Sequence, residues 1–448
     1  MNIVLEAPEI EAPPGVSQGG RGRIVHVRSR GEAERFAPAW DALTGNHPFR
    51  SRAWNLHWWD VYGRESPRSR SLELCILVWL DDHDQVRALA PWYLHRHPLW
   101  GRLVRFLGEH EVCGDYLGLL CRPGDEAATA RRFAEYLLGR RLPVDHAASQ
   151  DGLFRESGFR LADSPCPQWD VLELTGVEVS EPTVRYLVET LRQAGCLVDH
   201  RPALSGWRID LPQDWPDYLA GLTANARRRF RRLERQYFHD PRLRLHRVTS
   251  QDELREGFSV LERLHQALWN SRGQPGCFAS ARFREFHLRF ARDMLAQDRL
   301  NMVWLEWEGR PIVAEYQFLA DGTLYTYQSG MDPQWKHLSP GNLGNLLCIE
   351  DAIRRGCRHY DFCRGDEPYK AYLGAQPRPM GEWRIAAPRV VPRLRLRLWQ
   401  WAKSARKFAR QLAERRTSRD SSPVPDGDDT PRAASAPGDS DGTPLPPE

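Results

Sequence analysis

One pattern occurs twice in this sequence and constrains the fold more than any other feature. In the first half, the apolar run 77–81 is followed by a short polar turn and a second apolar run, 89–93. In the second half, the runs 302–306 and 313–317 are joined in the same way by a turn at Gly309. Apolar, β-rich runs joined by short polar turns predict β-hairpins. The repeat therefore predicts a duplicated body with one hairpin in each half.

Helical sequence precedes each hairpin, and this order indicates the fold class. A third strand follows the second hairpin and is entered through the turn dipeptide Asp321-Gly322. The predicted helices are 32–43 and 54–62 in the first half, and 252–269 and 280–296 in the second. Helices, antiparallel strands, a further helix and a last strand predict an α/β fold of mixed α+β type. We expect two such lobes, joined near residues 202–216.

The ends of the chain differ in composition from this body. The first residues are rich in Pro and Gly, and the last ones in Ser, Asp, Pro and Gly, so neither end can bury enough apolar surface to fold. Because 448 residues exceed one small core, the middle is divided into domains. The predicted boundaries are 1–20 for a disordered N-terminus, 21–200 and 201–390 for the lobes, 391–416 for a basic amphipathic helix, and 417–448 for a disordered tail.

Composition argues against several classes of protein. The net charge of +4 is too mild to indicate a DNA-binding protein. Nine cysteines stand without metal-ligand spacing, which predicts free thiols in a reducing compartment and no metal site. No apolar run reaches the roughly 18 residues that span a bilayer, and the N-terminus does not read as a secretion signal. We therefore expect a cytoplasmic protein.

The segment after the third strand predicts an anion-binding site. Ser339 stands at the expected N-cap of a helix over 342–355, with Pro340 at its first position and Gly341 and Asn342 next. Free amide groups and the positive end of the helix dipole favour a phosphate there, and Lys336 adds a charge. The alternative is an ordinary capped helix.

A predicted strand over residues 359–363 carries a carboxylate in its middle. Asp361 would be buried there, and a buried carboxylate needs a partner, for which Arg364 and Lys370 are candidates. We interpret this group as a ligand-binding cluster at the carboxyl edge of a sheet. A structural ion pair with a capped turn is the alternative.

Two other residues are candidate general bases. His265 shares a helix face with Trp269 and titrates near neutral pH, although a hydrogen-bonded core histidine is an equally good interpretation. Glu315 is flanked by apolar residues in a strand, where burial would raise its pKa. The alternative for Glu315 is an outward-facing position. An arginine-rich helix over 225–235 is also present, and we interpret it as a solvated helix with some affinity for anions.

At these positions the sequence resembles the BioF2-like or CelD-like acetyltransferases, relatives of the FemAB branch of the GNAT superfamily. The resemblance covers about 200–385 and is weak in the first lobe. It is carried by the arginine-rich helix at 223–234, Leu264-His265 with Trp269 and Gly273, Pro311-Ile312-Val313-Ala314, Ser339-Pro340-Gly341, Tyr360-Asp361-Phe362, Gly365 and Tyr369-Lys370. Where GNAT proteins have a glycine-rich pyrophosphate loop, this sequence has a single glycine, Gly341.

The resemblance implies tandem GNAT-like lobes that transfer an acyl group from acyl-CoA (acetyl-CoA), the co-substrate, to an amine. The acceptor would be a small molecule or a glycan precursor of envelope or exopolysaccharide biosynthesis. Under this hypothesis the catalytic residues are His265, Glu315, Asp361 and Lys370, the donor contacts are Ala314, Tyr316, Lys336, Ser339, Gly341 and Asn342, and the acceptor contacts are Trp269, Tyr327, Arg364 and Tyr369.

Two other functions are kept beside this one. A FemAB-type transferase would take its donor from aminoacyl-tRNA, and a non-catalytic partner of an envelope-assembly system would take none. The basic helix 391–416 adds a peripheral contact with the inner membrane as a further expectation, with packing on the second lobe as its alternative.

Overall fold

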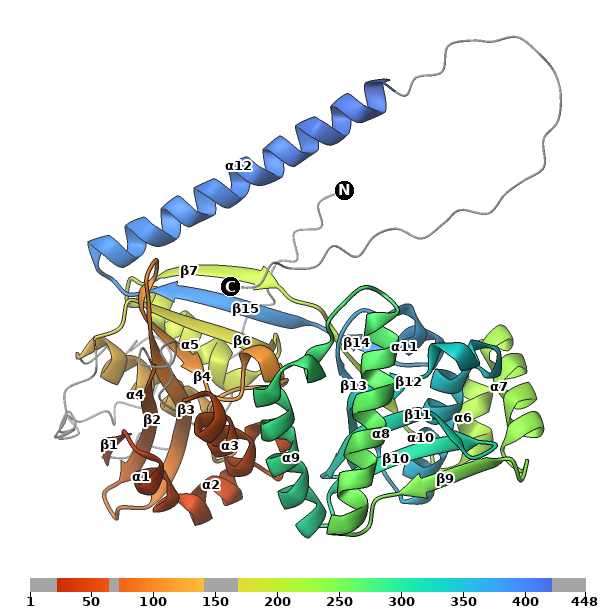
Figure 1. The fold of residues 1–448 in the computed structure, drawn as a ribbon. Coiled ribbons are helices and arrows are strands. Elements are labelled where there is room, and N and C mark those ends of the chain that lie inside the picture. The colour runs from red at the N-terminus through yellow and green to blue at the C-terminus, as the bar shows by residue number, and fades with distance from the viewer. Residues whose placement is uncertain (1–21, 64–71, 141–167, 421–448) are drawn as a thin grey trace. The chain divides into compact units, whose positions relative to one another are not determined.

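The computed structural model describes residues 22–63, 72–140 and 168–420, with side chains as far as Arg406. The predicted disordered N-terminus 1–20 and residues 421–448 of the predicted tail lie outside these ranges. The described chain has a mixed α/β fold with two sheets, and helices pack on both of them, as the sequence predicts (Figure 1).

The first sheet forms the first lobe. Its strand order is β1-β2-β3-β4-β6-β15-β7, and β5 pairs with β3. Its strands are β1 (Gly22–Val27), β2 (Leu72–Asp81), β3 (Val86–His97), β4 (Gly101–Phe106), β5 (Leu120–Cys121), β6 (Val171–Glu178), β7 (Leu197–Pro202) and β15 (Met380–Ala386). Its helices are α1 (Arg30–Glu34), α2 (Ala37–Leu43), α3 (Arg52–Tyr62), α4 (Glu126–Leu138) and α5 (Pro182–Gln193), with 3-10 turns η1 (Pro48–Arg50) and η3 (His110–Val112).

The second sheet has the order β14-β8-β13-β12-β11-β10-β9. Its strands are β8 (Gly206–Asp210), β9 (Leu243–Arg247), β10 (Leu300–Trp307), β11 (Arg310–Ala320), β12 (Thr323–Met331), β13 (His359–Arg364) and β14 (Gln376–Arg378). The helices of this half are α6 (Trp215–Gly221), α7 (Ala224–Tyr237), α8 (Gln251–Asn270), α9 (Ala281–Ala296), α10 (Pro340–Arg354), α11 (Pro368–Tyr372) and α12 (Val390–Asp420), with η5 (Cys277–Ala279) and η6 (Pro333–Leu338).

Both predicted hairpins are present, and the repeat extends further than the sequence pattern. The hairpins β2–β3 and β10–β11 are each followed by a third antiparallel strand, a helix and a strand parallel to that third strand. In the second lobe, the turns Glu308-Gly309 and Asp321-Gly322 place two successive residues at positive φ, between 47° and 76°. This is the geometry of type I′ turns, whose twist matches that of the strands.

One strand crosses between the halves of the chain. β15 follows the second lobe in sequence, yet it lies between β6 and β7 of the first sheet (Figure 1). The predicted boundaries assign this strand to the second lobe, whereas its hydrogen-bonding partners are in the first. The two lobes are therefore tied together by the backbone as well as by side chains.

Helices cover both faces of the second sheet. α8 and α9 pack on the face that carries Tyr316 and Phe318, and α7 and α10 pack on the face that carries Val313. Because both faces are covered, β11 is buried from Ile312 to Phe318 and reads as a nearly continuous apolar run. The polar exceptions in this run are Glu315 and Gln317.

Two predicted elements differ from the structure. The helix expected at 32–43 is broken into α1 and α2, because Pro38 lacks the N–H that would continue the ladder and instead stands in the first turn of α2. The basic helix continues to Asp420, past its predicted end at residue 416. The chain forms two compact units, which divide within this helix after Leu396.

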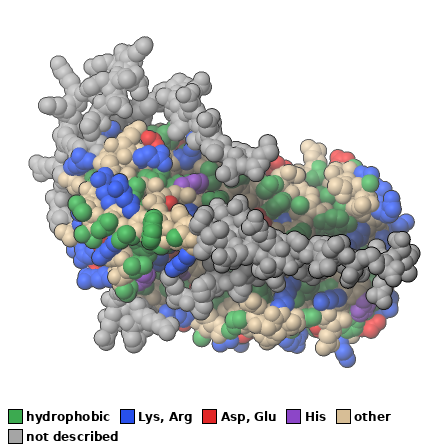
Figure 2. All heavy atoms as spheres, turned by 90° about the horizontal axis from the view of Figure 1, so that it is seen from above, with side chains coloured by type: hydrophobic (Ala, Val, Ile, Leu, Met, Phe, Trp, Pro, Cys, Tyr) green, Lys and Arg blue, Asp and Glu red, His purple; other side chains and the backbone are tan. Residues whose placement is uncertain are grey.

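Figure 2 shows basic side chains in several places on the part of this face that grey atoms leave uncovered. Lys and Arg side chains occur on separate parts of that face, with apolar and uncharged groups between them. None of the helices in the described ranges is both long and apolar enough to cross a membrane. The eight cysteines in the described part of the chain are all free.

Candidate functional site

The parallel ladder between β12 and β13 ends early. It joins Thr323 to His359, Leu324 to Tyr360 and Tyr325 to Asp361, and no later pair. β12 continues to Met331, still paired on its other side with β11. The carboxyl halves of the two parallel strands therefore separate at Asp361. Carboxyl ends of parallel strands are where α/β proteins usually bind ligands.

Asp361 stands at this point, and its partner comes from the first lobe. The Tyr116 hydroxyl donates to the carboxylate, 2.9 Å from each oxygen, and the Cys363 amide donates to Oδ1 at 2.7 Å. The expected pairing of Asp361 with Arg364 or Lys370 is wrong, because both cations have other partners. Burial raises the pKa of Asp361 to about 7, against the lowering effect of these two hydrogen bonds. A carboxyl group with that pKa can exchange a proton near neutral pH.

Arg364 and Lys370 hold the backbone that follows Asp361. The Arg364 guanidinium contacts Asp115 of the first lobe at 3.1 Å, and the Arg364 amide donates to the same carboxylate at 2.8 Å. The buried Lys370 ammonium donates to the Gly365 carbonyl at 2.9 Å and pairs with Glu367 at 2.9 Å. Lys370 thus fits the alternative of a structural ion pair in a turn, better than direct contact with a substrate.

The backbone is strained on both sides of this junction. Cys113 and Tyr116 in the first lobe have φ of 44° and 57°, and Cys363 in β13 has φ of 54°. Left-handed φ costs a non-glycine residue about 1–3 kcal/mol, and such residues cluster at functional sites. A further close contact is made at Gly206 of β8, where a Cβ would lie 2.6 Å from the Tyr116 hydroxyl. The pairing of Tyr116 with Asp361 therefore depends on features of several segments.

Tyr116 and Asp115 are the residues that sequence reasoning missed. They lie in a loop of the first lobe between two glycines, Gly114 and Gly118, which is a weak sign of a tight backbone. Nothing in that loop indicates contact with a strand near residue 361, because such a contact depends on how the lobes dock.

Glu315 is buried on the face of the second sheet that α10 covers. Both of its carboxylate oxygens lack a hydrogen-bond partner among the described residues. A Cβ on Gly344 of α10 would lie 3.1 Å from Oε1, so the helix packs closely over the carboxyl group. Burial raises its pKa to about 8. The outward-facing alternative is wrong, and Glu315 is mostly protonated at pH 7, so it can donate a proton more readily than accept one.

His265 is enclosed by protein groups. Its Nδ1 lies 3.1 Å from Gln266 Oε1, and its Nε2 lies 3.4 Å from the Cys277 sulfur. Burial lowers its pKa. The backbone of His265 packs on β12 so closely that a Cβ on Gly330 would lie 2.4 Å from its nitrogen. This environment favours the core interpretation of His265 over that of a base.

The expected donor contacts at the start of α10 are partly altered. α10 begins at Pro340, as predicted, but Ser339 is left-handed and makes no side-chain cap; its hydroxyl instead accepts from Arg229 of α7 at 3.2 Å. The Asn342 amide donates to the Ser339 carbonyl at 3.0 Å, so this start offers fewer free amides than expected. The side chain of Arg229 supplies a cation there, beside the exposed Lys336 of η6.

The other expected contacts lie in four different elements. Ala314 and Tyr316 lie in β11, whose backbone pairs with β10 and β12 on its two sides, so it is not free to bind a donor arm. Trp269 packs against His265, with ring centroids 5.8 Å apart. The Tyr327 hydroxyl donates to the Val112 carbonyl at 2.6 Å, which makes it a lobe contact. Tyr369 is 41% exposed near the end of β13.

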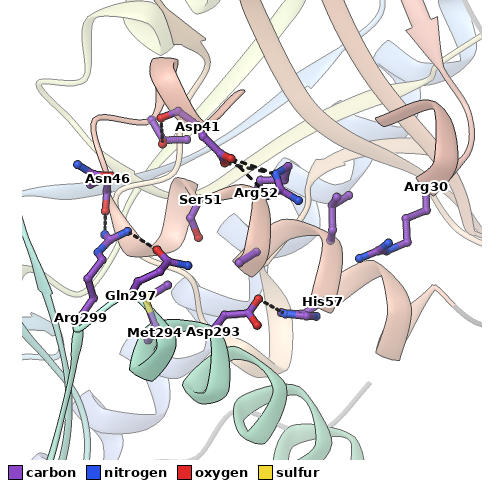
Figure 3. Close-up of a pocket in the computed structure, with 13 residues that line it drawn as sticks. Arg30, Asp41, Asn46, Ser51, Arg52, His57, Asp293, Met294, Gln297 and Arg299 are labelled. Atoms are coloured by element: carbon purple, nitrogen blue, oxygen red, sulfur yellow. Dashed lines mark hydrogen bonds and ion pairs between the residues drawn. The ribbon is translucent and has the colours of Figure 1, made fainter. Parts of the chain in front are cut away.

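A polar cavity of about 240 Å³ lies between the lobes at α3 and α9, and the sequence did not predict it (Figure 3). His57 and Asp293 pair across it at 2.7 Å, and Arg299 donates to the Asn46 carbonyl. Its charged side chains all have partners in the structure, and none of its lining residues belongs to the predicted site. In the described ranges, no group of three or more metal-ligating side chains lies together.

Comparison with known proteins identifies the second lobe. Residues 224–371, about a third of the chain, match the family model described as an acetyltransferase (GNAT) domain. No curated protein matches the sequence. The match contains β12, α10, β13 and both buried carboxyl groups, and it confirms the predicted relation to the GNAT superfamily.

Several solved structures are similar to this chain. FemX is 11% identical over 79% of this chain and 96% of its own, with a TM-score of 0.52. At an identity of 11%, the similarity to FemX shows that the two chains share a fold. A protein of unknown function from Bacteroides thetaiotaomicron is 12% identical over 79% and 97%, with a TM-score of 0.46. The C-terminal domain of a putative lysylphosphatidylglycerol synthetase from Agrobacterium fabrum is 9% identical over 82% and 96%, with a TM-score of 0.45.

Proposed function

We propose that this N-acyltransferase, whose residues 224–371 form a GNAT-type domain, moves an acyl group from acyl-CoA to an amine. The observation that carries the proposal is the early end of the β12–β13 ladder, which falls inside the matched segment. Beyond Tyr325, β12 pairs with no described strand on that side. An extended donor arm can hydrogen-bond the strand there in place of β13, with its phosphates toward Arg229 and Lys336.

Asp361 is the proposed general base. It stands where the strands separate, and a pKa of about 7 matches the ideal for proton transfer near neutral pH. The amine nitrogen attacks the thioester carbon, a C–N bond forms as the C–S bond breaks, and the proton leaves the amine for the Asp361 carboxylate. Tyr116 holds that carboxylate in position, so the first lobe contributes to the site.

Glu315 is the proposed acid for the departing thiolate. The carboxyl group is protonated at neutral pH because burial raises its pKa to about 8, and no described group competes for its proton. Burial is the main reason that the pKa values of Tyr360 and Tyr369 are raised, and the charge of Glu315 adds to the rise in both. The proposed roles of Asp361 and Glu315 thus follow from the different pKa values that burial produces.

The acceptor is proposed to be an amine of a glycan precursor, as the resemblance implies. Tyr369 is exposed beside β13 and offers an aromatic surface of the kind that sugars contact. Isothermal titration of the full chain with acetyl-CoA tests the donor. Release of free CoA in the presence of a panel of amino sugars tests the transfer.

Asp361→Asn is expected to lower turnover by about 10²- to 10⁴-fold and to leave acetyl-CoA affinity unchanged. Asp366→Asn is the matched control, because Asp366 lies five residues further on and bonds only Trp207 and the Ser205 amide in the described structure. Absence of saturable acetyl-CoA binding would overturn the donor. Full turnover in Asp361→Asn would overturn the base.

A second candidate takes its acyl group from aminoacyl-tRNA. The observation that favours it is α7, which exposes Arg228, Arg229, Arg231, Arg232 and Arg235 and reaches the start of α10 through Arg229. Such a row suits a nucleic-acid backbone. Binding of tRNA that Arg231→Gln/Arg232→Gln abolishes, together with no binding of acetyl-CoA, would favour this candidate over the first.

A further inference from the structure

The first part of α12 presents an apolar stripe to solvent. Val390, Leu394, Leu398 and Trp401 follow one another at intervals of four, four and three residues, which places them on one side of a helix with 3.6 residues per turn. Each of these side chains is between 54% and 81% exposed. Large apolar side chains exposed in a row are unusual on a monomeric surface and mark an interaction site.

Cations border this stripe on both sides. Arg393 and Arg397 each precede a leucine of the stripe, and so lie about 100° to one side of it. Arg395 and Arg406 lie at the other edge by the same geometry. Residues 390–406 contain no acidic side chain. Arg397 and Arg406 are exposed, whereas Arg393 also bonds the body and Arg395 is half-buried, so the exposed stripe has a free arginine near each margin.

The opposite side of the helix is used for attachment to the body. Leu396 is fully buried, and Pro392 is buried on the same side. The Arg389 guanidinium pairs with Asp170 of the first lobe at 2.9 Å, and Arg393 donates to the Gly195 carbonyl. The start of α12 thus has a packed side and a free side, and the apolar stripe is on the free side.

We propose that residues 390–406 bind the surface of an anionic lipid bilayer, with the stripe in the interface and the arginines against lipid phosphates. Charge complementarity selects this partner: an apolar strip lined on both sides by cations fits acyl chains beneath a layer of negative headgroups. Trp401 at the stripe's end suits the headgroup level, where indole rings are enriched. Such binding would hold the acyltransferase lobes at a membrane that carries their acceptor.

Co-sedimentation of the full chain with vesicles tests this. Vesicles of phosphatidylglycerol and phosphatidylcholine in equal parts are compared with phosphatidylcholine alone, at low and high salt. Binding is expected only with the anionic vesicles and is expected to weaken as salt rises. Leu398→Glu/Trp401→Glu is expected to reduce the partition coefficient by at least about tenfold, and Arg397→Gln by about fivefold per charge removed.

Leu99→Glu is the matched control, because Leu99 is an equally exposed leucine (60%) on the first lobe. It is expected to bind vesicles like the unaltered chain, and thermal melting checks that every variant is folded. Equal binding of all variants, or no binding to anionic vesicles, would overturn the proposal. So would a change in sedimentation from oligomer to monomer in Leu398→Glu/Trp401→Glu without lipid, since the stripe would then be a contact between copies of the chain.

Discussion

Replacing Glu315 with Gln should change how the stability of the protein depends on pH. Glu315 is buried with both oxygens unpartnered, and its pKa rises from 4.5 in the unfolded chain to about 8 in the fold. Below pH 4.5 the group is protonated in both states. Between 4.5 and 8 the unfolded chain loses the proton while the native protein keeps it, so unfolding becomes easier as pH rises. Above pH 8 the native protein holds an unpaired buried charge.

The magnitude follows from that shift of about 3.5 pKa units. Each unit corresponds to about 1.4 kcal/mol, so the free energy of unfolding contributed by this group falls by about 5 kcal/mol from pH 4.5 to pH 8. Structural relaxation would reduce this value, because a buried carboxylate draws in water when it ionises. A glutamine keeps the shape and cannot ionise. Any packing or hydrogen-bond cost of the amide is independent of pH and shifts the whole curve equally.

Urea denaturation of the wild type and Glu315→Gln at half-unit steps from pH 4.5 to 9 measures the effect. The difference in unfolding free energy should move in favour of the variant as pH rises and should level off near pH 8. Glu308→Gln, on the exposed β10–β11 turn, removes the same charge from a solvated position and is the control. A constant difference between wild type and Glu315→Gln across this range would refute the reasoning, because it would mean that Glu315 ionises equally easily in both states.

Three further outcomes are expected from the site. The kcat/KM of the wild type should rise through about pH 7 as Asp361 ionises, and Tyr116→Phe should move this limb to higher pH, because it removes a hydrogen bond that lowers the pKa of the carboxyl group. Gly330→Ala should lower the free energy of unfolding by about 1–3 kcal/mol and lower Tm, since the added Cβ would lie 2.4 Å from the backbone nitrogen of His265. Lys370→Met should lower the free energy of unfolding, measured by urea denaturation, by about 1–3 kcal/mol, because the Gly365 carbonyl would lose its hydrogen bond to the ammonium group.

Each of these has a result that would contradict it. An unmoved acidic limb in Tyr116→Phe would exclude Asp361 as the titrating base. Gly221→Ala is the control for Gly330→Ala, because nothing lies within 4 Å of the added Cβ and the helix should tolerate it. Equal Tm values for the two glycine variants would show that α8 and β12 are not in close contact. Unchanged stability of Lys370→Met would show that the turn does not depend on the ammonium group.

Much of the fold was predictable because its signals are local. The hairpin at Gly309 follows from apolar runs separated by a residue that accepts positive φ, and this needs no knowledge of the rest of the chain. The start of α10 at Pro340 and the helix containing His265 follow in the same way from periodicity and terminal residues. One error was local as well. A single helix was predicted at 32–43 from the hydrophobic pattern, although Pro38 lacks the N–H that would continue the helix.

The candidate site was predictable only in part. That Asp361 would be buried and would need a partner followed from a carboxylate in an apolar strand. The sequence did not show which group bonds the Asp361 carboxylate, because Tyr116 is 245 residues away along the chain and belongs to the other lobe. The direction in which Glu315 points was likewise open, since strand sequence alone does not say which faces are covered.

The sequence by itself thus determined the elements, the duplication and the family of the second lobe, because periodicity, turn chemistry and motif order are carried by neighbouring residues. Tertiary structure alone decided the chemistry: the β12–β13 ladder ends at Asp361, the first lobe supplies Tyr116, and two carboxyl groups acquire pKa values near 7 and 8. The physical reason is that a pKa shift depends on burial and on partners brought from distant segments, and neither exists until the lobes have packed.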